Sequence, residues 1–270
     1  MIHTKKSIIN QLKDMNAPQD SIVLMHSSLR CIGEVEGGGE ALLDILVEYF
    51  TNQGGLFCVP VHTAGNLFEG KEITLDITNP QNDLGAFSTI ALKSGKGLRS
   101  ENPVLSLVVF GDKEKAKKFI EEDSFITTPT APESCYGKLA TQNGYVLLVG
   151  VGQEKNTYLH CVAEMLNLPD RMADVENHVT VKRSNGEIVE RKIRMYHCNS
   201  TIDVSRRFPK YETAFRYHEC IRDGFIGNAP TQLCDAAKLK DTVSLIFKNA
   251  NGKDPLADEV PIPPKWFCNK

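Results

Sequence analysis

Residues 145–169 read YVLLVGVGQEKNTYLHCVAEMLNLP and carry, in succession, the signals of a strand, a loop and a helix. Residues 145–149 are apolar, rich in β-branched side chains and enclosed by two glycines, a pattern that predicts a buried strand. After a polar loop over 150–155, apolar side chains at helical spacing predict a helix that Pro169 ends. A strand that leads through a loop into a helix is the building unit of parallel α/β sheets.

His160 and Glu164 lie four residues apart near the start of this helix, where Asn156 or Thr157 can provide the N-cap. The positive end of the helix dipole disfavours imidazolium and so helps to keep His160 neutral. A neutral imidazole with a carboxylate within reach has what a general base requires. The other interpretation is an ordinary amphipathic helix in which the two side chains form a surface contact, and this fragment by itself favours it.

The composition is that of an ordinary globular protein, with 41% hydrophobic and 24% charged residues among 270. The formal net charge of -3 lacks the basic excess of a nucleic-acid binder. No apolar run approaches the roughly 20 residues that a membrane span needs. The eight cysteines are scattered without a CxxC pair and the start is no signal peptide, so we expect reduced thiols in a cytoplasmic protein. We expect one domain over 1–270, as a monomer or a homodimer.

The chain before the 145–169 stretch shows the same alternation of elements. A strand over 21–26, a helix over 40–51 and a strand over 56–61 give the rhythm of a parallel sheet. We therefore expect an α/β fold with a mostly parallel central sheet flanked by helices. The other expected elements are a small antiparallel hairpin near 178–198 with an Asn-Gly turn, helices over 4–16, 84–94, 113–122 and 211–223, a strand over 105–110, loops over 64–83 and 98–103, and a strand or helix within 236–249.

Three loops follow apolar strands, at 26–39, 60–63 and 150–160. In open α/β sheets, ligands bind beyond the carboxyl ends of the strands. The triplet Gly37-Gly38-Gly39 offers free backbone N–H groups that suit phosphate groups, although a flexible turn is the more common use of such glycines. His62 and Thr63 can line a pocket, or can be polar residues where a strand reaches the surface.

Metal and hydrolase motifs are weak in this chain. His197-Cys198 and His218-Glu219-Cys220 lack the regular spacing of a zinc site, and buried cysteine often serves as a small hydrophobic residue, so we expect no metal. There is no GxSxG motif, and Ser134 does not follow a clear strand, which argues against a serine nucleophile. Arg99 and Ser100 provide either an anion contact or a capped turn.

Five sequence motifs follow one another in a characteristic order: His26-Ser27-Ser28-Leu29 with Gly33 and Gly37-Gly38, Val59-Pro60-Val61-His62-Thr63, Arg99-Ser100 with Asn102-Pro103 and Ser106, Ser134-Cys135-Tyr136-Gly137-Lys138-Leu139, and Val149-Gly150-Val151-Gly152 with Asn156-Thr157 and His160. This order resembles the aminoglycoside N(3)-acetyltransferase family, especially its YokD-like branch, over about residues 5–250. The resemblance implies the antibiotic N-acetyltransferase type of fold, acetyl-CoA as acetyl donor, and the 3-amino group of a 2-deoxystreptamine aminoglycoside as acceptor.

The resemblance also implies roles for individual residues. His160 matches the catalytic histidine of the family and Thr157 the threonine before it. The family often has a glutamate three residues after the histidine, where this chain has Ala163, and the carboxylate of Glu164 comes one residue later. Asn102 stands where the family usually has histidine. The implied cofactor contacts are His26, Ser27, Ser28 and Leu29 for pantetheine and phosphates, Val61, His62 and Thr63 for the thioester end, and Arg99 and Ser100 for the phosphate region of CoA.

The mechanism that follows from this resemblance is a direct transfer. His160, polarised by Glu164, takes a proton from the amine, which attacks the thioester, while Thr157 or backbone N–H groups stabilise the oxyanion. The sequence shows no cysteine or serine that is evidently activated as a nucleophile, so direct transfer is favoured over a covalent intermediate. The alternative is a CoA-binding protein with little aminoglycoside activity, or with another amine as acceptor. Carboxylates that could bind a cationic acceptor are Asp170, Asp174, Glu176, Glu212 and Glu219.

Overall fold

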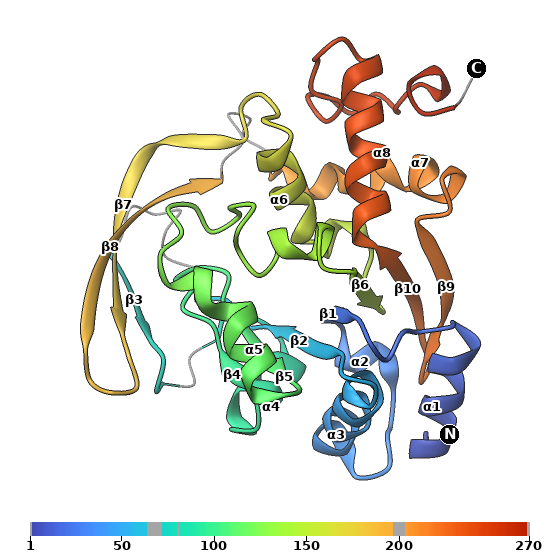
Figure 1. Cartoon of the computed structure of the whole chain (residues 1–270). Helices are drawn as coiled ribbons and strands as arrows, with labels where there is room; N and C mark the ends of the chain where they lie inside the picture. The colour runs from blue at the N-terminus through green and yellow to red at the C-terminus, as the bar shows by residue number, and fades with distance from the viewer. Residues whose placement is uncertain (1, 64–71, 80–81, 197–202, 269–270) are drawn as a thin grey trace.

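The central feature of the computed structural model is a seven-stranded sheet with the strand order β4-β5-β2-β1-β6-β10-β9 (Figure 1). The structure describes residues 2–63, 72–79, 82–196 and 203–268. In the middle of the sheet, β1 pairs in parallel with β2 on one side and with β6 on the other. The bounds of these strands are Ile22–Ser27 for β1, Leu56–Pro60 for β2 and Gly144–Val149 for β6.

The outer strands join this centre through antiparallel pairs. β5 pairs with β2 and β4 with β5, while β10 pairs with β6 and β9 with β10. As a result β4, β2, β1, β6 and β9 run in one direction and only β5 and β10 run against them, which confirms the predicted mostly parallel sheet. The outer strands span Leu98–Arg99 (β4), Leu107–Phe110 (β5), Ile221–Ile226 (β9) and Ala229–Asp235 (β10).

Helices cover both faces of the sheet, which explains why its central strands are largely apolar. Successive side chains of a strand point to opposite faces, so Leu24 lies in the core on one face and Val23 in the core on the other. The face of Leu24 packs against α5 (Lys113–Ile120), α6 (Tyr158–Met165), α7 (Glu212–Tyr217) and α8 (Ala236–Asn249). The face of Val23 packs against α1 (Lys5–Asp14), α2 (Leu29–Ile32), α3 (Gly38–Thr51) and α4 (Ala86–Lys93).

Among the described residues, no helix has both the length and the apolar character to cross a membrane.

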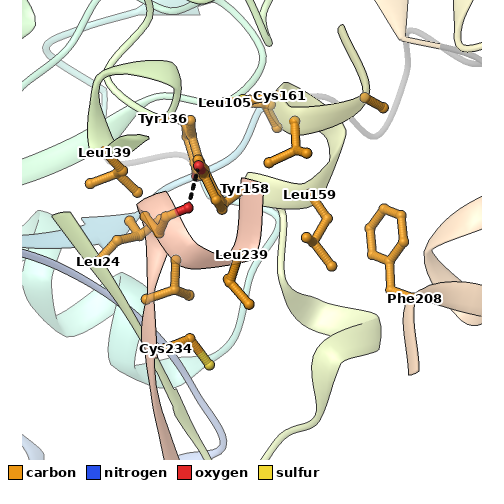
Figure 2. Close-up of a cluster of buried hydrophobic side chains, with 14 of the residues drawn as sticks. Leu24, Leu105, Tyr136, Leu139, Tyr158, Leu159, Cys161, Phe208, Cys234 and Leu239 are labelled. Atoms are coloured by element: carbon orange, nitrogen blue, oxygen red, sulfur yellow. Dashed lines mark hydrogen bonds between the residues drawn. The ribbon is translucent and has the colours of Figure 1, made fainter. Parts of the chain in front are cut away.

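The core beneath α6 and α8 contains large aromatic side chains. Figure 2 shows Tyr136 and Tyr158 in this cluster together with Leu24, Leu139 and Leu239, all at most 1% exposed. The hydroxyl of Tyr158 donates a 2.8 Å hydrogen bond to the carbonyl of Ala236, so its polar atom is satisfied within the core. This bond ties the start of α6 to the start of α8 and helps to hold α6 in place.

A second sheet of three strands, in the order β3-β7-β8, lies to one side (Figure 1). β7 (Met172–Lys182) and β8 (Ile188–Tyr196) form the predicted antiparallel hairpin, which is longer than expected at its start, and β3 (Ile73–Asp76) adds in parallel to β7. Gly186 has φ 85° in the connecting turn, as the Asn-Gly signal predicts. The end of the predicted hairpin, 197–198, lies outside the described residues.

Several local predictions need correction. The helix predicted over 211–223 ends at Tyr217, and β9 begins at Ile221, because Glu219 takes a positive φ of 53° that stops the helix. The uncertain segment 236–249 is the helix α8. The sequence patterns missed β3, β4 and β10, which are short or contain the polar and proline residues that usually mark loops.

Candidate active site

Three histidines from different parts of the sequence come together at the carboxyl ends of the central strands. His26 lies near the end of β1, His62 follows the end of β2, and His160 is the third residue of α6, after β6. Because β2, β1 and β6 are neighbours in the sheet and point the same way, their following loops meet at one edge. The charges of His26 and His160 both act on His62, so the three imidazoles share one site.

Burial keeps all three imidazoles uncharged at neutral pH. It lowers the pKa of His26 to about 4, with a further contribution from the charge of Lys155. It lowers the pKa of His62 to about 3, helped by the neighbouring charges of His26 and His160. For His160 burial is again the largest cause of a pKa of about 4, while Asp203 acts in the opposite direction. The sequence predicted a neutral His160 from its place near a helix N-terminus, and in the structure burial is the largest cause of its lowered pKa.

Acidification should weaken the folded state between pH 6.5 and about 4. An unfolded histidine titrates near 6.5, whereas the folded pKa of His26 is about 4, so the unfolded state binds more protons in this window. The contribution of His26 to the free energy of unfolding then falls by about 1.4 kcal/mol for each pH unit lost. Urea unfolding of the wild type and His26→Asn at several pH values tests this, since the variant should show the flatter dependence. Equal slopes would contradict it.

Two aromatic rings hold the side chain of His160. The ring centroid of Tyr196, at the end of β8, lies 4.2 Å from that of His160 at an interplanar angle of 32°. The second ring is that of Phe208, in the 3₁₀ segment Val204–Tyr211. Its centroid lies 4.9 Å from that of His160 at an interplanar angle of 66°. These contacts fix the ring by packing, and His160 remains partly exposed.

Glu164 does not pair with His160 as the spacing predicted. Its carboxylate oxygens accept hydrogen bonds of 2.5 Å each from the hydroxyls of Thr128 and Thr130. Within the described chain no hydrogen bond joins Glu164 to His160, and the carboxylate whose charge acts on His160 belongs to Asp203. No local signal marks Asp203, because it is more than 40 residues away in the sequence and its position depends on the tertiary fold.

Thr157 occupies the N-cap position of α6, but its side chain makes no capping hydrogen bond. Asn156 does not cap the helix either, because its Oδ1 accepts no hydrogen bond from any residue that the structure describes, while its Nδ2 donates to Oε1 of Gln153 at 2.8 Å. The capping prediction was therefore wrong, whereas the catalytic role of Thr157 stays a prediction. The half-buried Thr157 lies one turn before His160.

The predicted pantetheine and thioester residues surround the strand ends. Ser27 ends β1, and Ser28 precedes the short helix α2 with its N–H donating to the carbonyl of Val149 on β6 at 2.9 Å. Leu29 begins α2 and is half-buried. Val61 is fully buried, and Thr63 uses its hydroxyl to donate to the carbonyl of Pro103 at 2.8 Å. Contacts of these residues with a cofactor stay predictions.

Arg99, at the end of β4, and Ser100, in the following turn, both form hydrogen bonds within the protein. The Nη1 atom of Arg99 donates to the carbonyl of Asn79 at 3.0 Å, and Nε donates to Oγ of Ser106 at 3.3 Å. Ser106 in turn donates to the carbonyl of Val61 at 2.6 Å, which links Arg99 to the segment before His62. Ser100 is fully buried, and its hydroxyl accepts from the N–H of Leu107 at 3.1 Å. A phosphate contact of either residue stays a prediction.

The five carboxylates suggested for the acceptor do not form one cluster. Asp174 and Glu176 lie on β7 in the second sheet, whereas Glu212 lies on α7 on the far side of α6 (Figure 1). Glu212 accepts from Arg216 and from Gln232, and Glu219 follows α7 beside α8. Asp170 follows α6 with φ 55°. The sequence could not show this separation, because it results from the path of the chain between the two sheets.

The weak zinc motif has other partners in the structure. Nε2 of His218 hydrogen-bonds the carbonyl of Phe267 at 2.7 Å, and Sγ of Cys220 lies 3.3 Å from the hydroxyl of Thr242. His197 and Cys198 are outside the described residues. Across residues 2–63, 72–79, 82–196 and 203–268, no cluster of three or more His, Cys, Asp or Glu side chains could hold a metal ion.

This chain belongs to the aminoglycoside 3-N-acetyltransferase family, whose sequence model matches residues 24–248. It is 24% identical over 252 residues to aminoglycoside N(3)-acetyltransferase IV of Salmonella sp., covering 93% of this chain and 88% of that protein. It is also 24% identical over 272 residues to the SPbeta prophage-derived aminoglycoside N(3')-acetyltransferase-like protein YokD of Bacillus subtilis (strain 168), covering 93% and 94%. The resemblance stated from the motifs is confirmed.

Solved structures show the same fold. The complex of AAC-IIIb with CoASH superimposes with a TM-score of 0.76 at 20% identity, covering 94% of this chain and 99% of that one. A His-to-Ala mutant of aminoglycoside acetyltransferase AAC(3)-IVa in complex with a gentamicin gives a TM-score of 0.76 at 23% identity, covering 100% and 95%. The helices on both faces of the sheet and the loops at its carboxyl edge therefore belong to an arrangement shared with these enzymes.

Proposed function

We propose that this protein transfers an acetyl group from acetyl-CoA to an amino group of an aminoglycoside, at the 3-amino position of its 2-deoxystreptamine ring. The observation that carries the proposal is the meeting of His26, His62 and His160 at the carboxyl edge of the sheet in a member of this family. The complexes of AAC-IIIb with CoASH and of AAC(3)-IVa with a gentamicin support the choice of the two substrates. The free state of all seven described cysteines is in keeping with a cytoplasmic site of action.

His160 acts as the general base in this proposal. A neutral imidazole can accept the proton of the attacking amine, whereas an imidazolium cannot, and the pKa of about 4 keeps His160 in the competent form. Packing between Tyr196 and Phe208 fixes its ring, so little freedom is lost when the amine arrives. Thr157 and the serine turn at 27–28 complete the site around the thioester.

Release of the CoA thiol tests the proposed activity. With acetyl-CoA and an aminoglycoside that has a free 3-amino group, we expect steady thiol release and a product heavier by one acetyl group. The matched control is the same aminoglycoside with its 3-amino group already blocked, which should give no release above background. Tight CoA binding without thiol release for any amine would instead indicate a binding protein and would overturn the proposal.

A further inference from the structure

The hydrogen bond between His62 and Tyr136 has no role in the mechanism described so far. Tyr136 is fully buried, and its hydroxyl lies 3.0 Å from Nε2 of His62. The tyrosine comes from the 127–136 loop and the histidine from the segment after β2, so the bond joins two distant parts of the chain. Among the described residues the phenol has no other hydrogen-bond partner. This isolation restricts where its proton can go.

The support beneath Tyr136 is rigid. The N–H of Cys135 donates to Oδ1 of the buried Asp123 at 2.9 Å, and the N–H of Gly137 donates to Oγ of Ser134 at 3.1 Å. A Cβ on Gly137 would lie 2.3 Å from the carbonyl oxygen of Pro132, so the chain passes too closely for any side chain. The phenol therefore cannot easily turn away to find another partner.

The bond selects one tautomer of His62. A neutral imidazole carries its proton on one nitrogen and offers a lone pair on the other. If Nε2 held the proton, it would donate to the phenol oxygen, and the buried phenol proton would have no acceptor. If the phenol donates to Nε2, the buried phenol proton has an acceptor and the proton of His62 resides on Nδ1. The second arrangement is favoured because it pairs the proton of the fully buried phenol.

Nδ1 of His62 is then a hydrogen-bond donor without a partner. No residue in the described part of the chain bonds to it, and the side chain is partly exposed. The imidazole lies close enough to His26 and His160 for their charges to influence it. An unpaired N–H in the same site as the proposed general base is suited to a substrate oxygen on which negative charge develops.

We infer that His62, held as its Nδ1–H tautomer by Tyr136, donates a hydrogen bond to the carbonyl oxygen of the acetyl thioester. This inference rests on the proposed acetyl transfer. As the amine nitrogen bonds to the carbonyl carbon, the C=O π electrons move to the oxygen, which Nδ1–H stabilises, and His160 takes a proton from the amine. The oxyanion then collapses, the C–S bond breaks, and the imidazolium of His160 protonates the departing thiolate to give CoA and the amide. Tyr136 is a positioning residue, because it acts through His62.

Two substitutions of His62 distinguish this role from a structural one. Asparagine places its amide donor where Nδ1 of histidine lies, whereas glutamine extends its amide toward the position of Nε2. We expect His62→Gln to lower kcat by about 10²–10³-fold with little change in the KM for acetyl-CoA, and His62→Asn to recover most of that loss. Equal activity of the two variants would overturn the inference. A wild type that acetylates no amine would remove the proposed function as well.

The tautomer can be read without turnover. Nitrogen-15 NMR of histidine-labelled protein should show a protonated Nδ1 and an accepting Nε2 for His62 in the wild type. In Tyr136→Phe the accepted hydrogen bond is lost, so we expect a mixture of tautomers and a lower kcat at unchanged CoA affinity. A wild-type His62 protonated on Nε2 would overturn the inference even if the enzyme acetylates aminoglycosides.

Discussion

Replacing His160 with alanine should lower the kcat of acetyl transfer by about 10²–10⁴-fold, the usual contribution of a positioned general base. The variant loses the only imidazole that packs between Tyr196 and Phe208 in the described structure. The affinity for CoA should change little, because the predicted cofactor contacts lie at the end of β1, on the segments after β1 and β2, and in and directly after β4. Steady-state thiol release and calorimetric CoA binding measure the two quantities separately.

His178 provides a matched control for this substitution. It is an exposed histidine on β7, away from the strand ends, and His178→Ala should retain wild-type kcat. Thermal unfolding of His160→Ala separates a chemical effect from a packing defect, since the aromatic contacts also contribute to stability. Wild-type turnover in His160→Ala would exclude this residue as the base.

Replacing Arg171 with methionine should destabilise the fold by about 3–5 kcal/mol, because it leaves a largely buried carboxylate without its charge partner. Nη2 of Arg171 lies 2.6 Å from both oxygens of Asp254, and the two side chains are only 4% and 12% exposed. This ion pair connects the segment after α6 to the C-terminal segment, which also binds Arg207 through the carbonyls of Leu256 and Ala257. Urea unfolding measures the loss.

Two comparisons make this prediction specific. Adding Asp254→Asn to Arg171→Met removes the unpaired charge and should restore part of the lost stability. Lys5 and Glu48 form an ion pair whose side chains are 55% and 63% exposed, so Glu48→Ala should cost less than about 1 kcal/mol. A loss of similar size in Arg171→Met and Glu48→Ala would show that burial does not determine the strength of these pairs.

The site follows from the order of strands more than from local spacing. The motif residues after β1, β2 and β6 could be placed together because parallel strands bring their carboxyl ends to one edge. The pairing of His160 with Glu164 failed, since helical spacing allows a contact but cannot show that Thr128 and Thr130 bind the carboxylate instead. The bond from Tyr136 to His62 spans 74 residues and has no local pattern.

The limits of fold prediction have a similar origin. The strands β1, β2 and β6 are buried on both faces and therefore read as continuous apolar runs. The short strand β4 contains Arg99, and β10 contains Pro230 and Gln232, so neither shows the usual apolar pattern. Their pairing is determined by neighbours far away in the sequence, which a single segment cannot reveal.

The protonation state of His160 in the CoA-bound enzyme tests the central claim most directly, because the proposed base must be an uncharged imidazole. Nitrogen-15 NMR at about pH 5.5 distinguishes the two forms, since an ordinary histidine is mostly protonated there. With its pKa lowered to about 4, His160 should give the signals of a neutral ring. The signals of an imidazolium at that pH would contradict the account of how this site accepts a proton from an amine.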